Sequence, residues 1–443
     1  MMPRRLAPLF ALLALLVAAL PAGAVEIARV VSPGGIVAWL VRDTTLPLVA
    51  LQFRFRGGSA SEPADRAGVG RLAIDLLDEG AGDLEATAFA RALEERAIGL
   101  DISIGADSIQ GGMRVLDVHR DRGVELLRLA LTEPRFDPPA VERVRARILA
   151  GFARESEDPR ALLRRAFQTR AYGAHPYAAA LEAEIAGTRA ARAEDLRGFV
   201  AARLARDNLV VGVVGNIAPA ELAPLLDRVF GGLPAASAPV AVPEVAVTNP
   251  GPRTVVIPRD VPQSLKMFGA PGLKRDDPDW FAGLIVNYVL GGGGFNSRLM
   301  TELRERRGLT YGVSTSLVAL DRGAAVVGSY STDNARAAEA LALVEAEWRR
   351  MAQDGPTEAE LADAKSFLTG SFPLTLDSSA AVARLLVSLQ YDGLGIDYLQ
   401  RRDALIAAVT LDDARRVARR LFGGPGLLTV IVGRPAGVAG DGG

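Results

Sequence analysis

An internal repeat constrains the fold of this chain more than any other sequence feature. One pattern, an amphipathic helix, a short turn and an apolar strand that ends on glycine, occurs near the middle of the chain and again near its end. Further upstream, a Pro-started helix and a charged helix that breaks at glycine also recur. The repeated pairs are 185–215 with 406–433, 139–152 with 356–372, and 93–103 with 303–314. A repeat of this length predicts two homologous domains.

A linker separates the two predicted domains. The segment PAASAPVAVPEVAVTNPGPR, residues 234–253, is rich in Pro and Ala and has no helical period, as is typical of linkers. We therefore expect domains at 25–233 and 254–443. Five apolar runs read as strands: 48–55, 100–105, 210–214, 325–331 and 427–433. Clustered helices between them predict an α+β fold, with a mixed or antiparallel sheet and helices on one face in each domain.

The first 24 residues have the form of an export signal. Arg4 and Arg5 precede an apolar run, Leu6 to Leu20, and a small-residue cleavage site ends at Ala24. The alternative is a membrane anchor, but the run is short for a span. We expect cleavage near Ala24 and a periplasmic or secreted protein without a stable membrane anchor.

Composition restricts the chemistry that this chain can perform. The net charge is −1, which argues against a nucleic-acid partner, because phosphate binding needs a basic surface. The sequence has no cysteine, so thiolate metal sites and thiol nucleophiles are excluded. Its two histidines, His119 and His175, lie far apart in the sequence. A catalytic zinc site usually takes three protein ligands, so one is hard to build within this chain.

Three segments carry a family resemblance. They are GVGRLAIDLLDEGA (68–81), PPAVERVRARILAGFARESEDP (138–159) with HPY (175–177), and GGGGFNSRLMTELRERRGLTYGVSTSL (291–317). Together with the repeat, they resemble the pitrilysin/insulinase family of processing-peptidase-like zinc peptidases, the inverzincins, whose metal motif is H-x-x-E-H. The resemblance implies two homologous domains that form half of a clamshell chamber in which unfolded peptides are cleaved.

The metal motif is degenerate in this sequence. In the family motif, two histidines one helical turn apart bind zinc and the glutamate activates a zinc-bound water. Here the first histidine is replaced by Arg71, the base by Ile74 and the second histidine by Asp75, while the distal glutamate falls on Gly151 or a neighbour. An alkyl side chain cannot activate water. We therefore interpret 68–80 as a structural helix, with no metal in this chain and zinc in a partner subunit.

A second family feature, an Arg/Tyr pair, is retained. Arg304 and Tyr311 stand seven positions apart in RERRGLTY. The resemblance implies that such a pair sits opposite the zinc, holds the substrate backbone and stabilises the oxyanion, which suits guanidinium and phenol donors. Without the resemblance, the two would read as a surface arginine and a half-buried tyrosine. We expect Arg298 to form a structural ion pair, and the Gly291–Gly294 run to permit a tight turn or close backbone approach.

The residues and the resemblance are consistent with two functions. In the first, the chain is the non-catalytic subunit of a heterodimeric zinc metallopeptidase and donates Arg304 and Tyr311 to a zinc-binding paralogous partner. Unfolded peptides would then bind as an added strand at a sheet edge. In the second, it is an inert binding or scaffold subunit of a periplasmic assembly. The retained pair favours the first, and the lack of ligands argues against a third, an active peptidase with a relocated metal site.

Overall fold

The computed structural model describes residues 26–239, 241–247, 254–424 and 426–440. The expected export signal, 1–24, and part of the expected linker lie outside these ranges. Within the described part of the linker region, 234–239 and 241–247 form neither helix nor strand.

The first half of the chain folds around a six-stranded mixed sheet. Its strands in spatial order are β1 (Ala28–Val31), β2 (Val37–Arg42), β8 (Leu209–Gly215), β3 (Leu48–Arg56), β7 (Ser108–Leu116) and β6 (Gly99–Ile104). β2 and β8 run parallel, and the other neighbours are antiparallel. A short hairpin, β4 (Gly80–Ala81) with β5 (Leu84–Glu85), lies apart from this sheet.

The second half repeats this plan with five strands. Their spatial order is β11 (Val313–Leu320), β12 (Gly323–Asp333), β10 (Gln263–Pro271), β13 (Leu428–Gly433) and β9 (Thr254–Pro258). Again one pair is parallel, β13 with β9, and the rest are antiparallel. The predicted mixed α+β architecture and the repeat are confirmed, and all five predicted strands are present. β6 and β11 are edge strands of their sheets.

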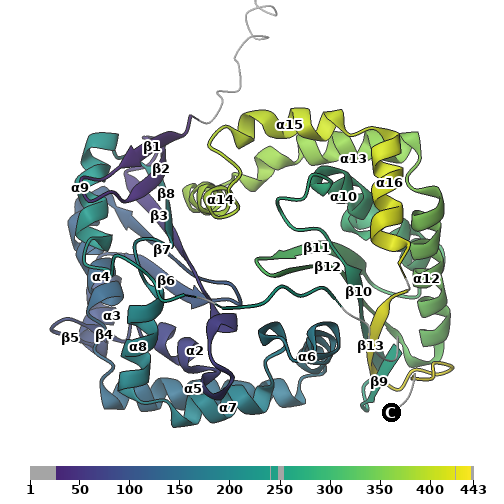
Figure 1. The fold of residues 1–443 in the computed structure, drawn as a ribbon, viewed down its shortest axis with the longest axis horizontal. Coiled ribbons are helices and arrows are strands. Elements are labelled where there is room, and N and C mark those ends of the chain that lie inside the picture. The colour runs from purple at the N-terminus through teal and green to yellow at the C-terminus, as the bar shows by residue number, and fades with distance from the viewer. Residues whose placement is uncertain (1–25, 240, 248–253, 425, 441–443) are drawn as a thin grey trace, which may run out of the picture.

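Helices form an outer layer around the two sheets (Figure 1). Those of the first half are α2 (Val69–Ile74), α3 (Ala86–Glu94), α4 (Arg120–Thr132), α5 (Pro138–Glu157), α6 (Pro159–Tyr172), α7 (Leu181–Ala190), α8 (Ala193–Arg203) and α9 (Pro219–Phe230). Those of the second half are α10 (Trp280–Asn287), α11 (Arg298–Met300), α12 (Ala337–Asp354), α13 (Glu358–Gly370), α14 (Ser379–Tyr391), α15 (Tyr398–Ala408) and α16 (Leu411–Phe422). None of the helices in the described ranges is long and apolar enough to cross a bilayer.

One helix from each half packs against the sheet of the other half, a feature that the sequence did not predict. α14 lies against β8 and β3 of the first sheet, and α6 lies against β13 and β10 of the second. Leu386 of α14 is fully buried in a cluster with Trp39 and Val214. Phe167 of α6 is likewise buried, in a cluster that contains Val430 of β13. Each sheet is thus covered by its own helices outside and by an exchanged helix inside.

A polar cluster joins the turn of the β6–β7 hairpin to the turn of the β11–β12 hairpin. The Tyr177 hydroxyl donates to the Asp107 carboxylate at 2.5 Å, and the other Asp107 oxygen accepts the Asp321 amide at 3.0 Å. The Tyr391 hydroxyl, at the end of α14, donates to Asp321 at 2.7 Å. The Arg56 guanidinium stacks on the Tyr391 ring and pairs with Asp321. Because these residues come from both halves, the cluster fixes their relative position.

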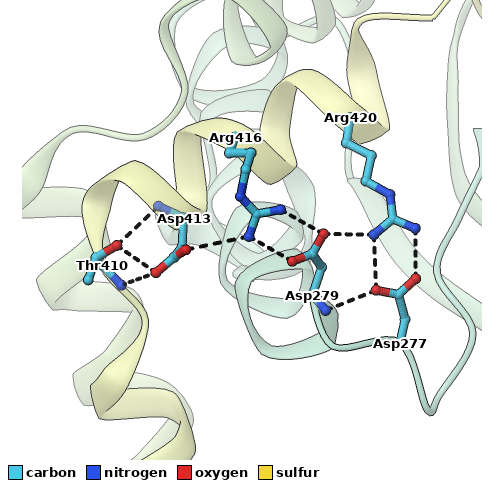
Figure 2. Close-up of polar contacts among 6 residues, drawn as sticks. All are labelled: Asp277, Asp279, Thr410, Asp413, Arg416 and Arg420. Atoms are coloured by element: carbon cyan, nitrogen blue, oxygen red, sulfur yellow. Dashed lines mark hydrogen bonds and ion pairs between the residues drawn. The ribbon is translucent and has the colours of Figure 1, made fainter.

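A surface network holds α16 against the segment before α10 (Figure 2). Its members are Asp277, Asp279, Thr410, Asp413, Arg416 and Arg420. Arg416 donates to both oxygens of Asp279, at 2.9 and 2.8 Å, and Arg420 donates to both oxygens of Asp277. The Arg420 bonds lower the pKa of Asp277, and the Arg416 bonds lower that of Asp279. Thr410 and Asp413 form a capping box at the start of α16, in which the side chain of each accepts the backbone amide of the other.

We predict that Leu386→Ala destabilises the whole chain. Truncating this fully buried side chain leaves a void between α14 and the first sheet, and such changes lower the free energy of unfolding by about 2–5 kcal/mol. Urea unfolding measures the loss. Leu374→Ala is the control, because Leu374 is 78% exposed. Equal effects of the two changes would contradict the role given to the exchanged helices.

Candidate functional site

The structure brings the predicted Arg/Tyr pair together. Arg304 lies on η7, the π-helical turn Thr301–Glu305, and Tyr311 precedes the edge strand β11. The centre of the Arg304 guanidinium lies 4.8 Å from the centroid of the Tyr311 ring. Tyr311 is 86% exposed, so its hydroxyl faces outward instead of into a core. In the described ranges, no hydrogen bond or ion pair engages either side-chain polar group. Their donors are available to an external acceptor.

Phe295 completes the arrangement and was missed in the sequence. Its ring centroid lies 4.6 Å from the Arg304 guanidinium, so Arg304 contacts both Phe295 and Tyr311. Phe295 is 59% exposed, an unusual position for so apolar a side chain. The available signal was an aromatic residue directly after the Gly291–Gly294 run. Cation–π contacts of this kind restrict the guanidinium orientation.

The polypeptide around the pair is held by close backbone packing. η5, the π-helical turn Tyr288–Gly292, contacts β11. A side chain at Gly291 would come within 2.6 Å of the Thr315 hydroxyl, so only glycine fits there without displacement. The predicted close backbone approach is confirmed at this position. The segment that carries Phe295 is thereby set directly against the strand that follows Tyr311.

Arg298 forms the structural ion pair that the sequence predicted. Its guanidinium donates to both oxygens of Glu360, each at 2.7 Å, and to the Gly355 carbonyl at 2.9 Å. Burial alone would raise the pKa of Glu360, but the hydrogen bonds from Arg298 and Thr357 outweigh it and hold the pKa at about 2. The pair joins α11 to the start of α13. Because α11 directly precedes η7 in the chain, the pair also supports the position of Arg304.

A hollow of about 630 Å³ opens beside the pair. Phe295 and Phe367 contribute exposed aromatic surface to it, and Glu305 and Asp363 contribute carboxylates. Phe295 connects the Arg/Tyr pair to this hollow, whose lining is both apolar and acidic.

The degenerate zinc frame lies at α2 and α5, which pack against each other. The prediction of a helix over 68–80 is wrong in extent: α2 ends at Ile74, Asp75 is its C-cap, and the chain then turns into β4. Arg71 on α2 places its guanidinium 5.2 Å from the ring centroid of Phe152, which follows Gly151 on α5. Ile74 is 1% exposed and belongs to the core of the first half. A side chain at Gly151 would meet no other atom within 4 Å. The Asp75 carboxylate lies 3.8 Å from Arg147 of α5.

The groups at this frame do not suit a zinc ion. Burial raises the pKa of Asp75, and the charges of Arg71 and Arg147 counteract the rise. The frame thus offers one carboxylate among cations, where zinc needs several nitrogen, sulfur or oxygen ligands. Across the described ranges, no cluster of three or more His, Cys, Asp or Glu could hold a metal.

His175 has a structural role between the end of α6 and the short 3₁₀ turn that follows. Its Nε2 lies 2.9 Å from the Pro243 carbonyl oxygen, and its Nδ1 accepts the Tyr177 amide at 3.2 Å. α6 ends at Tyr172, shortly before it. His175 is the N-cap of the 3₁₀ turn Pro176–Ala178 that follows.

We predict that Glu360→Gln lowers stability at neutral pH and that its cost disappears in acid. The folded-state pKa, about 2, lies below the ordinary value of 4.5. The stabilisation is therefore complete above pH 4.5 and is lost as the pH falls toward 2. Urea unfolding of both proteins at pH 7, 4 and 3 measures the difference. A difference that stays constant with pH would contradict the assignment.

Comparisons with known proteins point to one family. The family model described as the peptidase M16 inactive domain matches residues 190–368. The chain is 27% identical, over 80% of its length and 82% of the relative, to the "non-peptidase homolog YmxG" of Helicobacter pylori.

Among solved structures, one described as a peptidase M16 inactive domain from Pseudomonas fluorescens superposes with a TM-score of 0.86 at 26% identity. That match covers 94% of this chain and 98% of the other. The periplasmic protease PqqL of Escherichia coli shares the fold, with a TM-score of 0.78 at 16% identity over 93% of this chain and 46% of PqqL. Residues 190–368 thus match the inactive domain of the peptidase M16 family, and over most of its length the chain is similar to proteins of that family, the pitrilysin/insulinase family that its sequence resembles.

Proposed function

We propose that this chain is the non-catalytic subunit of a two-subunit zinc peptidase and supplies the Arg304/Tyr311 pair to a zinc site on its partner. The observation that carries the proposal is the pair itself. Two strong donors lie side by side, the Tyr311 hydroxyl faces outward and the Arg304 side chain is half-buried, and neither has an acceptor among the described residues of its own chain. A buried structural arginine would be paired, as Arg298 is.

The chemistry of the pair suits amide hydrolysis. The Tyr311 O–H would donate to the oxygen of the scissile carbonyl as negative charge develops on it. The Arg304 guanidinium, oriented by Phe295 and the Tyr311 ring, would hold a neighbouring backbone carbonyl. The substrate would be an unfolded peptide that pairs as an added strand with the free edge of β11. Zinc on the partner would supply the activated water.

The proposal also concerns location. The export signal expected at 1–24 and a fold shared with a periplasmic protease support a periplasmic or secreted site of action. The scaffold hypothesis predicts no use for the exposed pair.

We predict that cleavage requires both subunits and this pair. The mature chain is mixed with a zinc-binding paralogue from the same source, and cleavage of an unstructured peptide is followed. Tyr311→Phe keeps the ring contact with Arg304 but removes the O–H, so kcat should fall by about 100-fold, as for the loss of one oxyanion donor. Arg304→Ala should cause a similar loss.

Arg306→Ala is the matched control, because this nearby guanidinium pairs with Glu302 instead of facing Tyr311. Full activity of the mixture with the Tyr311 and Arg304 variants would make this chain a scaffold. Zinc-dependent cleavage by this chain alone would overturn the two-subunit proposal.

A further inference from the structure

A second hollow, on the inner face of the second sheet, is lined by positively charged side chains and, among the described residues, by no acidic ones. It measures about 360 Å³ and lies between the first turns of α6 and the strands β10, β11 and β12. Gly312, which directly follows Tyr311, is part of its lining. We call the site formed by Arg160, Arg164, Ser314, Ser329 and Ser331 the arginine hollow.

The arginine hollow has cations but no acid. Arg160 and Arg164 stand one turn apart on α6, and both are exposed. Neither guanidinium has a hydrogen bond or ion pair in the described part of the chain, and no Asp or Glu lines the hollow. The Lys266 ammonium points to the opposite side of the sheet, where it donates to the Ala337 carbonyl.

The floor of the hollow is built of hydroxyls. The inner face of the sheet is apolar where α6 covers it, with Met267 and Val430 packed in the same cluster. Toward the edge strand this face carries Ser314 and Ser329, which are directly paired across β11 and β12. Serine hydroxyls donate hydrogen bonds to carboxylate oxygens, so the floor and the two guanidiniums suit the same ligand.

The corresponding place in the first half has an acidic residue of its own. Arg384 stands on α14 where Arg164 stands on α6, six positions after the N-cap residue of each helix. There the hollow under the exchanged helix contains Asp101, whose charge interacts with that of Arg384. The second half keeps the arginine but has no such carboxylate, which leaves a place for an external one.

We propose that the arginine hollow is a subsite for an acidic side chain, Asp or Glu, of the peptide that pairs with β11. This inference rests on the proposed function, in which an extended peptide adds to that edge. Side chains of an added strand alternate between the two faces of the sheet. Those on the inner face, next to Tyr311 and Gly312, project toward Arg160 and Arg164. A side-chain carboxylate is preferred over a chain end because the hollow lies beside the strand path.

Peptide binding to the full chain without any partner tests the subsite. Three labelled, capped, extended peptides differ only at a central Glu, Gln or Lys, and anisotropy gives their affinities. The Glu peptide should bind about five- to tenfold more tightly than the Gln peptide, as expected for two solvent-exposed ion pairs. Arg160→Gln combined with Arg164→Gln should abolish the preference, and Arg164→Glu should shift it toward Lys. Added salt should weaken it.

Arg170→Gln is the matched control, since Arg170 is an exposed arginine on α6 outside the hollow. Failure of the Glu peptide to bind more tightly than the Gln peptide, including no binding by either, overturns the subsite. So does an equal loss with Arg170→Gln, or a preference seen only for an uncapped C-terminal carboxylate. Glu-selective binding that needs Arg160 and Arg164, without cleavage by the mixture, would retain the subsite and refute the two-subunit peptidase.

Discussion

The exchange of α6 and α14 is the interaction on which the rest of the structure depends. Neither sheet buries its inner face with helices of its own half alone. Apolar strand surface left in water would cost about 25 cal/mol per Å², so each half is completed by the other. The hairpin-tip cluster around Asp107 and Asp321 adds directional hydrogen bonds to this non-directional packing. The two halves therefore act as a single support for the surfaces between them.

That support explains how an exposed pair can be well ordered. Tyr311 and Phe295 are solvent-facing aromatics, yet each contacts Arg304 and each follows a segment fixed by buried groups. Arg298 and Glu360 fix one side, and the packing of Gly291 on Thr315 fixes the other. Preorganised donors stabilise developing charge without a reorganisation cost at the moment of reaction. The arginine hollow adjoins the pair, because Gly312, which follows Tyr311, is part of its lining.

The two halves have diverged in opposite directions. On the first half, the resemblance places a core isoleucine, Ile74, at the position of the catalytic base, and Arg71 and Asp75, which lie in a local charge network, at the positions of two metal ligands. On the second half, groups that could bind a substrate remain exposed and uncompensated. This asymmetry is what a division of labour between subunits would require. It is also why the zinc chemistry of the proposed function is assigned to a partner.

The sequence by itself determined the repeat, the α+β class, five strands and the loss of the metal ligands, because periodicity and residue identity are local properties. It did not reveal β7, which contains Gly111 and Gly112, or β10, which contains the buried Lys266, since these residues are poor strand signals. Burial lowers the pKa of Lys266 to about 8, a cost that only its tertiary setting explains. Only the tertiary structure decided the helix exchange, the stacking of Phe295 on Arg304 and the arginine hollow. These depend on contacts between residues distant in sequence, and no local pattern encodes which distant surface will cover a given strand.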